Sequence, residues 1–325
     1  MNLVANSVVT TKLIRGINSE AISLTATPRS RFIALGNFDG LHLGHRQLLK
    51  TLKDSSRSFP GALCSLVSFY PHPAVVLGKT KLRPPLMTLR QRLEVLSELG
   101  FDELIMIRFS RTFSQLSAEH FVNQLLINKL KLHTLFVGPD AAIGKGREAG
   151  IDVMRRLLAA QGAKLEVVPH LKKSEQKIGT RSIRDNLQSG AIQLANEALG
   201  VPFSLYGRVV KGDGRGKGIS IPTANLACKQ ILPMFGVYVG IAQVGSTYHH
   251  AIINIGERPT FKGQGARVEA HLYDYSGEDF YQQRISIDLL SRIRDEQRFA
   301  SVSDLVTQIR LDIEKARSYF KLGTQ

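Results

Sequence analysis

The chain has 325 residues, of which 43% are hydrophobic, and carries a formal net charge of +16. This length and hydrophobic content favour globular cores over disorder and predict two domains. No stretch approaches the roughly 18 apolar residues of a membrane span, and residues 1–11 lack the apolar segment of a secretory signal. The two cysteines, Cys64 and Cys228, are far apart and have no metal or redox spacing, so a reducing, cytoplasmic location is expected.

A glycine-rich string near the start of the chain stands between a predicted strand and a predicted helix. The apolar run 32–35 precedes the string Gly36–His45, and a helical pattern follows it. This layout brings backbone N–H groups and the positive end of a helix dipole against a phosphate. His42 and His45 are three residues apart and share one face of the first helical turn. Two imidazoles beside free N–H groups suit a polyphosphate whose charge shifts during a reaction.

Short apolar segments then alternate with helical patterns. Strands are expected at 62–69, 104–107 and 135–137, and helices at 89–99, around 121–126 and at 151–158. This alternation predicts a parallel sheet with helices on both faces, and ligands at the carboxyl ends of its strands.

A helix predicted over 183–199 ends at Gly200, which places the domain boundary close to residue 200. The remainder is rich in strand patterns, expected at 205–210, 237–243, 250–255, 268–273 and 284–289. An antiparallel barrel follows from this pattern. A terminal helix aligns Leu305, Ile309, Ile313 and Ala316, and Ser301-x-x-Asp304 is a capping signal at its start.

A second glycine-rich segment lies in the C-terminal half. Gly212, Gly214, Gly216 and Gly218 let the backbone approach a phosphate closely, and Arg215 and Lys217 add positive charge. Thr223 and Asn225 point to one side of an extended segment, and their oxygen atoms suit Mg²⁺. Alternation places Glu269 on a polar strand face, which by pattern alone fits a catalytic face and a solvated face equally well.

The string Gly36–His45 resembles the signature of the nucleotidyltransferases related to class I aminoacyl-tRNA synthetases. In particular, it is similar to the N-terminal domain of the bacterial bifunctional riboflavin kinase/FAD synthetase family. The segment 212–226 resembles the flavokinase signature, and further matches lie at 69–73, 254–260, 268–272 and 293–297. The resemblance runs from about Lys12 to the C-terminal helix.

This resemblance implies an α/β fold in two parts. Residues 12–200 would form a Rossmann-like nucleotidyltransferase domain with a parallel sheet. Residues 201–325 would form an antiparallel β-barrel flavokinase domain with a terminal helix. The implied activities are phosphorylation of riboflavin to FMN, and adenylylation of FMN to FAD with release of pyrophosphate. ATP is the co-substrate, Mg²⁺ is the cofactor, and no nucleic acid or membrane partner is expected.

Site residues follow from the matched motifs. Glu269 would be the catalytic base of the kinase, and His42 and His45 would act in adenylyl transfer. The residues implied for ATP and phosphate binding are Gly36, Asn37, Asp39, Gly44, Thr180, Ser182, Arg184, Gly212, Arg215, Gly216 and Lys217. Those implied for substrate binding are Asp140, Asn254 and Arg258, and those implied for Mg²⁺ are Thr223 and Asn225.

Two segments depart from the family pattern. The segment 179–184 reads Gly-Thr-Arg-Ser-Ile-Arg, where relatives read nearer to Ile-Ser-Ser-Thr-x-Ile-Arg. Ala141 and Ile143 replace two phenylalanines that relatives usually carry after Asp140. These changes leave open an alternative, a working flavokinase with a weakened or inactive N-terminal domain. A nucleic-acid-binding protein, suggested by the net charge, is disfavoured because the basic residues are scattered.

Overall fold

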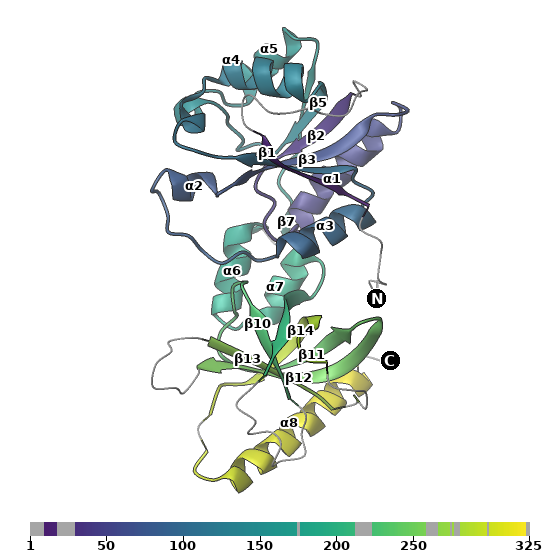
Figure 1. The fold of residues 1–325 in the computed structure, drawn as a ribbon, viewed down its shortest axis with the longest axis vertical. Coiled ribbons are helices and arrows are strands. Elements are labelled where there is room, and N and C mark those ends of the chain that lie inside the picture. Colours follow the sequence, from purple (N-terminus) through teal and green to yellow (C-terminus); the bar gives the residue numbers. More distant parts are fainter. Residues whose placement is uncertain are drawn as a thin grey trace. The chain divides into compact units, whose positions relative to one another are not determined.

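The computed structural model describes residues 10–17, 30–173, 176–211, 223–257, 266–273, 275, 280–297 and 299–322. These residues form two compact units (Figure 1). The sheet unit holds the described residues up to Arg83 together with Leu89–Ile178. The barrel unit holds Pro84–Thr88 together with the described residues from Gly179 onward. The predicted domain limits, 12–200 and 201–325, assign one activity to each part of the chain. This assignment remains a prediction.

A six-stranded sheet in the order β1-β4-β3-β2-β5-β6 forms the centre of the sheet unit. All neighbouring strands run parallel, which confirms the predicted class of this half. The strands are β1 (Lys12–Ile17), β2 (Arg31–Leu35), β3 (Leu63–Tyr70), β4 (Glu103–Arg108), β5 (Leu132–Val137) and β6 (Lys164–Val167). The predicted strands are present as β2, β3, β4 and β5, whereas the two edge strands, β1 and β6, were not predicted.

Helices cover both faces of this sheet. In Figure 1, α1 and α3 lie on one side, and α4 and α5 lie on the other. The helices of the sheet unit are α1 (Leu43–Ser56), α2 (Pro73–Val76), α3 (Leu89–Glu98), η1 (Phe113–Gln115), α4 (Ala118–His120), η2 (Phe121–Lys129), η3 (Lys145–Arg147) and α5 (Ile151–Ala159). Alternate strand residues pack on η2 and α5, among them Ile33, Val67, Ile105 and Leu135. The short antiparallel pair β7 (Lys172–Lys173) and β8 (Gln176–Lys177) follows the sheet.

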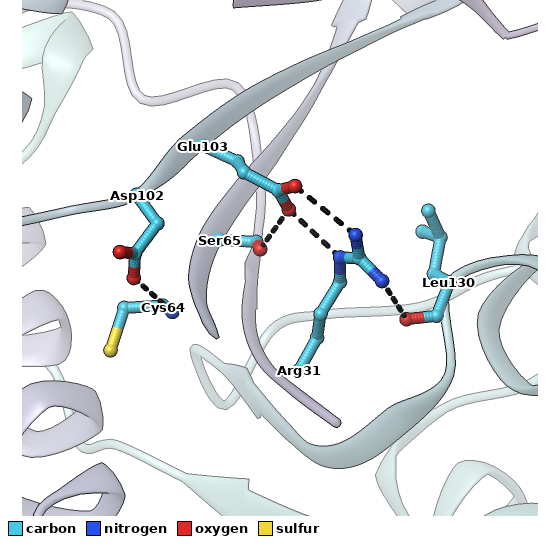
Figure 2. Close-up of polar contacts among 6 residues, drawn as sticks. All are labelled: Arg31, Cys64, Ser65, Asp102, Glu103 and Leu130. Atoms are coloured by element: carbon cyan, nitrogen blue, oxygen red, sulfur yellow. Dashed lines mark hydrogen bonds and ion pairs between the residues drawn. The ribbon is translucent and has the colours of Figure 1, made fainter. Parts of the chain in front are cut away.

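A buried ion pair ties the amino ends of three strands together (Figure 2). The Arg31 guanidinium donates to both carboxylate oxygens of Glu103, at 2.8 and 3.1 Å, and to the carbonyl of Leu130 at 3.1 Å. The Ser65 hydroxyl donates to the same carboxylate at 2.7 Å. Burial raises the pKa of Glu103, but the hydrogen bonds from Arg31 and Ser65, together with the charges of Arg31 and Lys12, outweigh burial, so the net pKa is lowered. This edge is opposite to the carboxyl ends of the strands, so the network supports the sheet.

Glu103→Ala should therefore destabilise the sheet unit strongly, because it leaves the buried Arg31 charge without its partner. Breaking a buried pair in this way costs about 3–5 kcal/mol. Urea unfolding at pH 7 measures the loss of stability. Asp54→Ala, which removes an exposed partner of Lys50, is the matched control and should change the stability little.

Because folding lowers the pKa of Glu103, the contribution of this residue to stability is present above the unfolded pKa and is lost as pH falls through the folded pKa. The difference in free energy of unfolding between wild type and Glu103→Ala should therefore become smaller as the pH falls below about 4.3. A constant difference from pH 7 to 3 would contradict the assignment.

The barrel unit contains a closed barrel in the order β10-β13-β12-β11-β14-β9, in which every neighbouring pair is antiparallel. This confirms the predicted barrel. The strands are β9 (Phe203–Val210), β10 (Thr223–Cys228), β11 (Gly236–Val244), β12 (Thr247–Glu257), β13 (Ala266–Leu272) and β14 (Arg284–Arg294). Alternation fills the interior as predicted: Ile285, Ile287 and Leu289 are buried, whereas their neighbours in sequence are not.

The prediction of one continuous helix over 183–199 is wrong in its continuity. The structure has two helices, α6 (Thr180–Gln188) and α7 (Ile192–Leu199). Gly190 separates them with φ +78°, a left-handed conformation that ends a helix. The apolar stripe continues across the break, because Ile183, Ile192 and Leu199 all join the barrel core.

The C-terminal helix α8 (Val302–Leu322) begins as predicted, since the Ser301 hydroxyl accepts a hydrogen bond from the Asp304 amide at 3.1 Å. Ala316 packs on the barrel, together with the partly buried Ile313 and Phe320. Within the described residues, no helix is both long and apolar enough to cross a bilayer.

Candidate active sites

The turn after β2 is the predicted phosphate-binding string, and it lies at the carboxyl edge of the sheet. The Gly36 amide donates to the Val67 carbonyl at 3.1 Å, which continues the β2–β3 pairing into the turn. Phe38 and Leu41 are buried and have φ of +51° and +43°, respectively. Non-glycine residues in this region carry backbone strain, which the surrounding packing must hold. The turn is thus rigidly shaped ahead of α1.

The two histidines predicted for this turn lie against each other. The rings of His42 and His45 stack with centroids 3.7 Å apart and an angle of 19° between their planes. His42 is also the N-cap of α1, and its Nδ1 accepts a hydrogen bond from the His45 amide at 3.3 Å. Because Nδ1 is the acceptor, the proton of the neutral ring is on Nε2. His42 therefore has one N–H donor available on the other side of its ring.

Burial keeps both imidazoles neutral. It lowers the pKa of His42 to about 4, although the charge of Asp39 partly opposes this shift. Burial also lowers the pKa of His45 well below its ordinary value, and the charges of His42 and Arg92 lower it further. At neutral pH the free protein therefore presents two uncharged rings, which suits hydrogen bonding to a phosphate.

Other predicted residues complete this edge. The Asn37 amide lies 2.9 Å from Nε2 of His72, whose Nδ1 accepts from the Ala74 amide and caps α2. A Cβ on Gly44 would lie 3.3 Å from the His42 ring, which is a tight contact. Glycine at this position therefore leaves room for the ring. Asp39 belongs to the same turn, and its charge raises the pKa of His42. The structure brings these predicted residues to one edge of the sheet, at the ends of β2 and β3.

Asp140 follows β5 at the same edge of the sheet. One carboxylate oxygen of Asp140 lies 2.8 Å from Nε2 of His170, and Arg147 donates to its carbonyl at 2.7 Å. His170 was not predicted, because a single histidine beyond a strand has no distinguishing pattern. Ile143 is only 8% exposed and packs with the half-buried Ala141 on the core of the sheet unit.

The start of α6 carries Thr180, Ser182 and Arg184, which were predicted to bind phosphate. This helix belongs to the barrel unit. Ser182 closes its first turn: the hydroxyl donates to the Gly179 carbonyl at 2.9 Å and accepts from the Gly179 amide at 3.3 Å. The phosphate role of these residues stays a prediction.

In the barrel, three predicted residues form one row across neighbouring strands. Glu269 of β13 pairs directly with Asn225 of β10 on one side and with Asn254 of β12 on the other. Side chains opposite each other in this way have Cβ atoms about 4.5–5.5 Å apart. The intervening residues of β13 are buried, as alternation predicted, so the row lies on the outer face. Thr223 lies on this face, two residues before Asn225.

Arg267 links two residues of this row. Its Nε donates to Oδ1 of Asn225 at 3.0 Å, and its Nη2 forms an ion pair with Glu269. The sequence placed Arg267 on the same face as Glu269 but predicted no role for it. The other predicted kinase residues, Gly212, Arg215, Gly216, Lys217 and Arg258, lie outside the described residues.

Comparison with known proteins covers both units. The family profile described as FAD synthetase matches residues 24–182, and the profile described as riboflavin kinase matches residues 199–320. The bifunctional riboflavin kinase/FMN adenylyltransferase of Escherichia coli strain K12 is 35% identical over 314 residues, which are 96% of this chain and 98% of the relative. That of Bacillus subtilis is 34% identical over 294 residues, 89% of this chain and 92% of the relative. The chain belongs to the bifunctional riboflavin kinase/FMN adenylyltransferase family.

Each family profile covers one of the two groups of candidate site residues. The stacked histidines lie within the FAD synthetase match, and the row around Glu269 lies within the riboflavin kinase match. The fold is shared over most of the chain with a crystal structure from Streptococcus pneumoniae named a macrolide-efflux protein. The TM-score is 0.83 at 28% identity, covering 95% of this chain and 99% of the other. That name describes the other protein, and the similarity between the two chains is one of fold.

Proposed function

We propose that this chain makes FMN from riboflavin in its C-terminal domain and FAD from FMN in its N-terminal domain, with ATP as the co-substrate of both reactions. The observation that carries this function is the presence of both family matches in one chain at full length. Nothing in these comparisons favours the alternative of a flavokinase with an inactive N-terminal domain. The predicted limits of the two domains, 12–200 and 201–325, belong to this proposal, as does a cytoplasmic location.

In the kinase reaction, a riboflavin hydroxyl attacks the γ-phosphorus of ATP and ADP leaves. Glu269 accepts the proton of that hydroxyl as a general base. Arg267 fixes the Glu269 carboxylate, and Asn254 lies beside it in the row for contact with the substrate. Thr223 and Asn225 carry hard oxygen atoms of the kind that Mg²⁺ prefers, on the same face of β10, and would hold the ion. Oδ1 of Asn225 accepts from Nε of Arg267, so it would bind the ion through its second lone pair. When bound, the ion neutralises the phosphate charge.

In the adenylyl-transfer reaction, a phosphate oxygen of FMN attacks the α-phosphorus of ATP, and the bond to pyrophosphate breaks. The nucleophile is already an anion, so no base is needed, and catalysis depends on position and charge. His42 donates from Nε2 to a phosphate oxygen because its Nδ1 is occupied by the cap of α1. The His45 ring packs against the His42 ring and holds it in this orientation.

Incubation with riboflavin, ATP and Mg²⁺, followed by separation of riboflavin, FMN and FAD over time, tests this function. FMN should appear first and FAD should follow. FMN that forms without FAD would restore the flavokinase-only alternative, and unchanged riboflavin would contradict the kinase assignment.

Ala141 and Ile143 should weaken the use of FMN relative to ATP. If the phenylalanines usual at these positions line the flavin site, their absence removes apolar and stacking contacts with the flavin. An aromatic pair contributes about 0.5–1.5 kcal/mol beyond the effect of its buried area. We expect FMN to accumulate before FAD appears, and Ala141→Phe with Ile143→Phe to lower the KM for FMN more than that for ATP. Ile143 belongs to the core, where a larger side chain costs about 1–3 kcal/mol. Ala141→Phe alone is therefore the matched variant. If neither folded variant improves FMN use, other residues already fill the gap.

A further inference from the structure

The turn that follows β5 holds the backbone of Asp140 rigidly. The Ala141 amide donates to the Gly138 carbonyl at 3.1 Å, which closes a tight turn. Pro139 and Asp140 occupy the two central positions of this turn, and proline at the first of them has its φ fixed in advance. Arg147 donates to the Asp140 carbonyl at 2.7 Å from farther along the same loop. The backbone of Asp140 is therefore fixed on two sides.

The side chain of Asp140 is held as well, although it is 69% exposed. Nε2 of His170 lies 2.8 Å from Oδ2 of Asp140, and because an ionised carboxylate has no proton to give, the imidazole donates. His170 follows β6, where the Val168 amide donates to the Val137 carbonyl at 2.9 Å and extends the β5–β6 pairing. A Cβ on Gly138 would lie 3.6 Å from Cε1 of His170, so the ring packs beside the turn.

The contact between His170 and Asp140 contributes little to stability, because an exposed pair of this kind is screened by water. The turn and Arg147 already fix the backbone of Asp140, so the fold does not depend on His170. What His170 does fix is the orientation of the carboxylate. An ionised carboxylate has about four acceptor positions, so one hydrogen bond from His170 leaves others for a ligand.

This carboxylate stands where sheets of this kind bind ligands. β5 pairs with β2, and the turns after both strands lie at the carboxyl edge of the sheet, where the crevice of an open α/β sheet takes its ligand. The turn after β2 carries the stacked histidines that would bind phosphate. A carboxylate repels a phosphate by its charge. Asp140 therefore suits a different part of a substrate, an uncharged group with an N–H or O–H to donate.

We propose that His170 is a positioning residue of the adenylyl-transfer site, where it fixes the Asp140 carboxylate as an acceptor for an N–H or O–H group of FMN or ATP outside the phosphates. This inference rests on the proposed adenylyl transfer. Both substrates carry such groups, on the flavin ring and ribityl chain of FMN and on the adenine and ribose of ATP. No bond forms or breaks at either residue, so the pair acts on the binding of one substrate and not on the chemical step.

The first test compares His170→Ala with His170→Gln, which keeps an N–H donor of similar reach. FAD formation is measured while FMN and ATP are varied in turn, and riboflavin phosphorylation is measured on the same preparations. We expect His170→Ala to raise the KM for one of the two substrates by about three- to tenfold, with kcat within about twofold of wild type. A rise for FMN places the donor on the flavin, and a rise for ATP places it on the nucleoside. His170→Gln should restore the KM. His120→Ala, an exposed histidine of the same unit, is the control and should match wild type.

A double-mutant cycle shows whether His170 acts through Asp140. Asp140→Ala should raise the same KM at least as much, and adding His170→Ala to it should cause no further rise, because no carboxylate is left to orient. Additive effects of the two substitutions would contradict the proposal. An unchanged KM for both substrates in folded His170→Ala would overturn it, and so would an equal rise for both. If His170→Ala does not fold, His170→Phe takes its place, because it keeps a ring against Gly138 and removes the donor.

Wild-type protein that makes no FAD from FMN would be a failure of the proposed function and not of this inference. Equilibrium binding of FMN and of ATP to wild type and to His170→Ala then tests His170. Weaker binding of one of the two ligands to the variant supports the positioning role, whereas equal binding of both ligands overturns it.

Discussion

Glu269→Gln should abolish FMN formation and leave FAD formation from supplied FMN unchanged. The substitution keeps the size of the side chain and removes the group that accepts the riboflavin proton. Loss of a general base typically costs about 10²–10⁴-fold in rate. Because Glu269 lies in the central position of its cross-strand row, the change alters the row without disturbing the buried residues of β13. Rates of riboflavin phosphorylation and of FAD formation measure the two activities separately.

The matched control is Glu314→Gln, an exposed residue of α8 in the same unit. It removes an equal charge outside the row and should keep both activities. Riboflavin phosphorylation at the wild-type rate in Glu269→Gln would remove Glu269 from the role of base. Loss of both activities in that variant would indicate a folding defect, which a thermal unfolding curve would reveal.

His45→Ala should have the converse effect: adenylyl transfer falls and riboflavin phosphorylation stays. The ring of His45 stacks on that of His42, so its removal leaves the Nε2–H donor of His42 without support. Loss of a single preorganised donor to a developing charge costs about 10²–10³-fold in kcat. Formation of FAD from FMN and ATP, measured with riboflavin phosphorylation on the same preparation, provides the comparison.

His42 needs a more careful substitution because it also caps α1. His42→Ala would lose the cap as well, at a cost of about 1 kcal/mol, whereas His42→Asn keeps an acceptor for the His45 amide. His42→Asn should lose adenylyl transfer and retain stability. His120→Ala, which removes an exposed histidine of α4, is the control and should resemble wild type. Full adenylyl transfer in both His42→Asn and His45→Ala would contradict the assignment of this site.

The sequence predicted those parts of the fold in which one physical rule dominates. Strict alternation predicted which residues of β13 and β14 face the barrel interior, since a strand with one buried face must alternate. The edge strands β1 and β6 were missed, and β10 was expected only as an extended segment around Thr223 and Asn225. Pairing with their neighbours defines these strands more than apolar content does. The break at Gly190 was missed because the apolar stripe continues through it.

The candidate sites show the same division. His42, His45 and Glu269 stand in continuous strings whose spacing fixes their geometry, and the structure places the two histidines together. Arg267 reaches its site from a neighbouring position of the same strand. Only the ion pair shows that Arg267 holds Glu269. A sequence pattern has no period that could reveal this contact.

A mixing experiment tests most directly the central claim that one chain carries two independent sites. Glu269→Gln and His45→Ala are each supplied with riboflavin, ATP and Mg²⁺, first separately and then together. Alone, Glu269→Gln should leave riboflavin unchanged and His45→Ala should stop at FMN. Mixed, they should form FAD, because FMN released by one protein is adenylylated by the other. If the mixture forms no FAD while each variant is folded and FMN accumulates, two independent sites of this kind are contradicted.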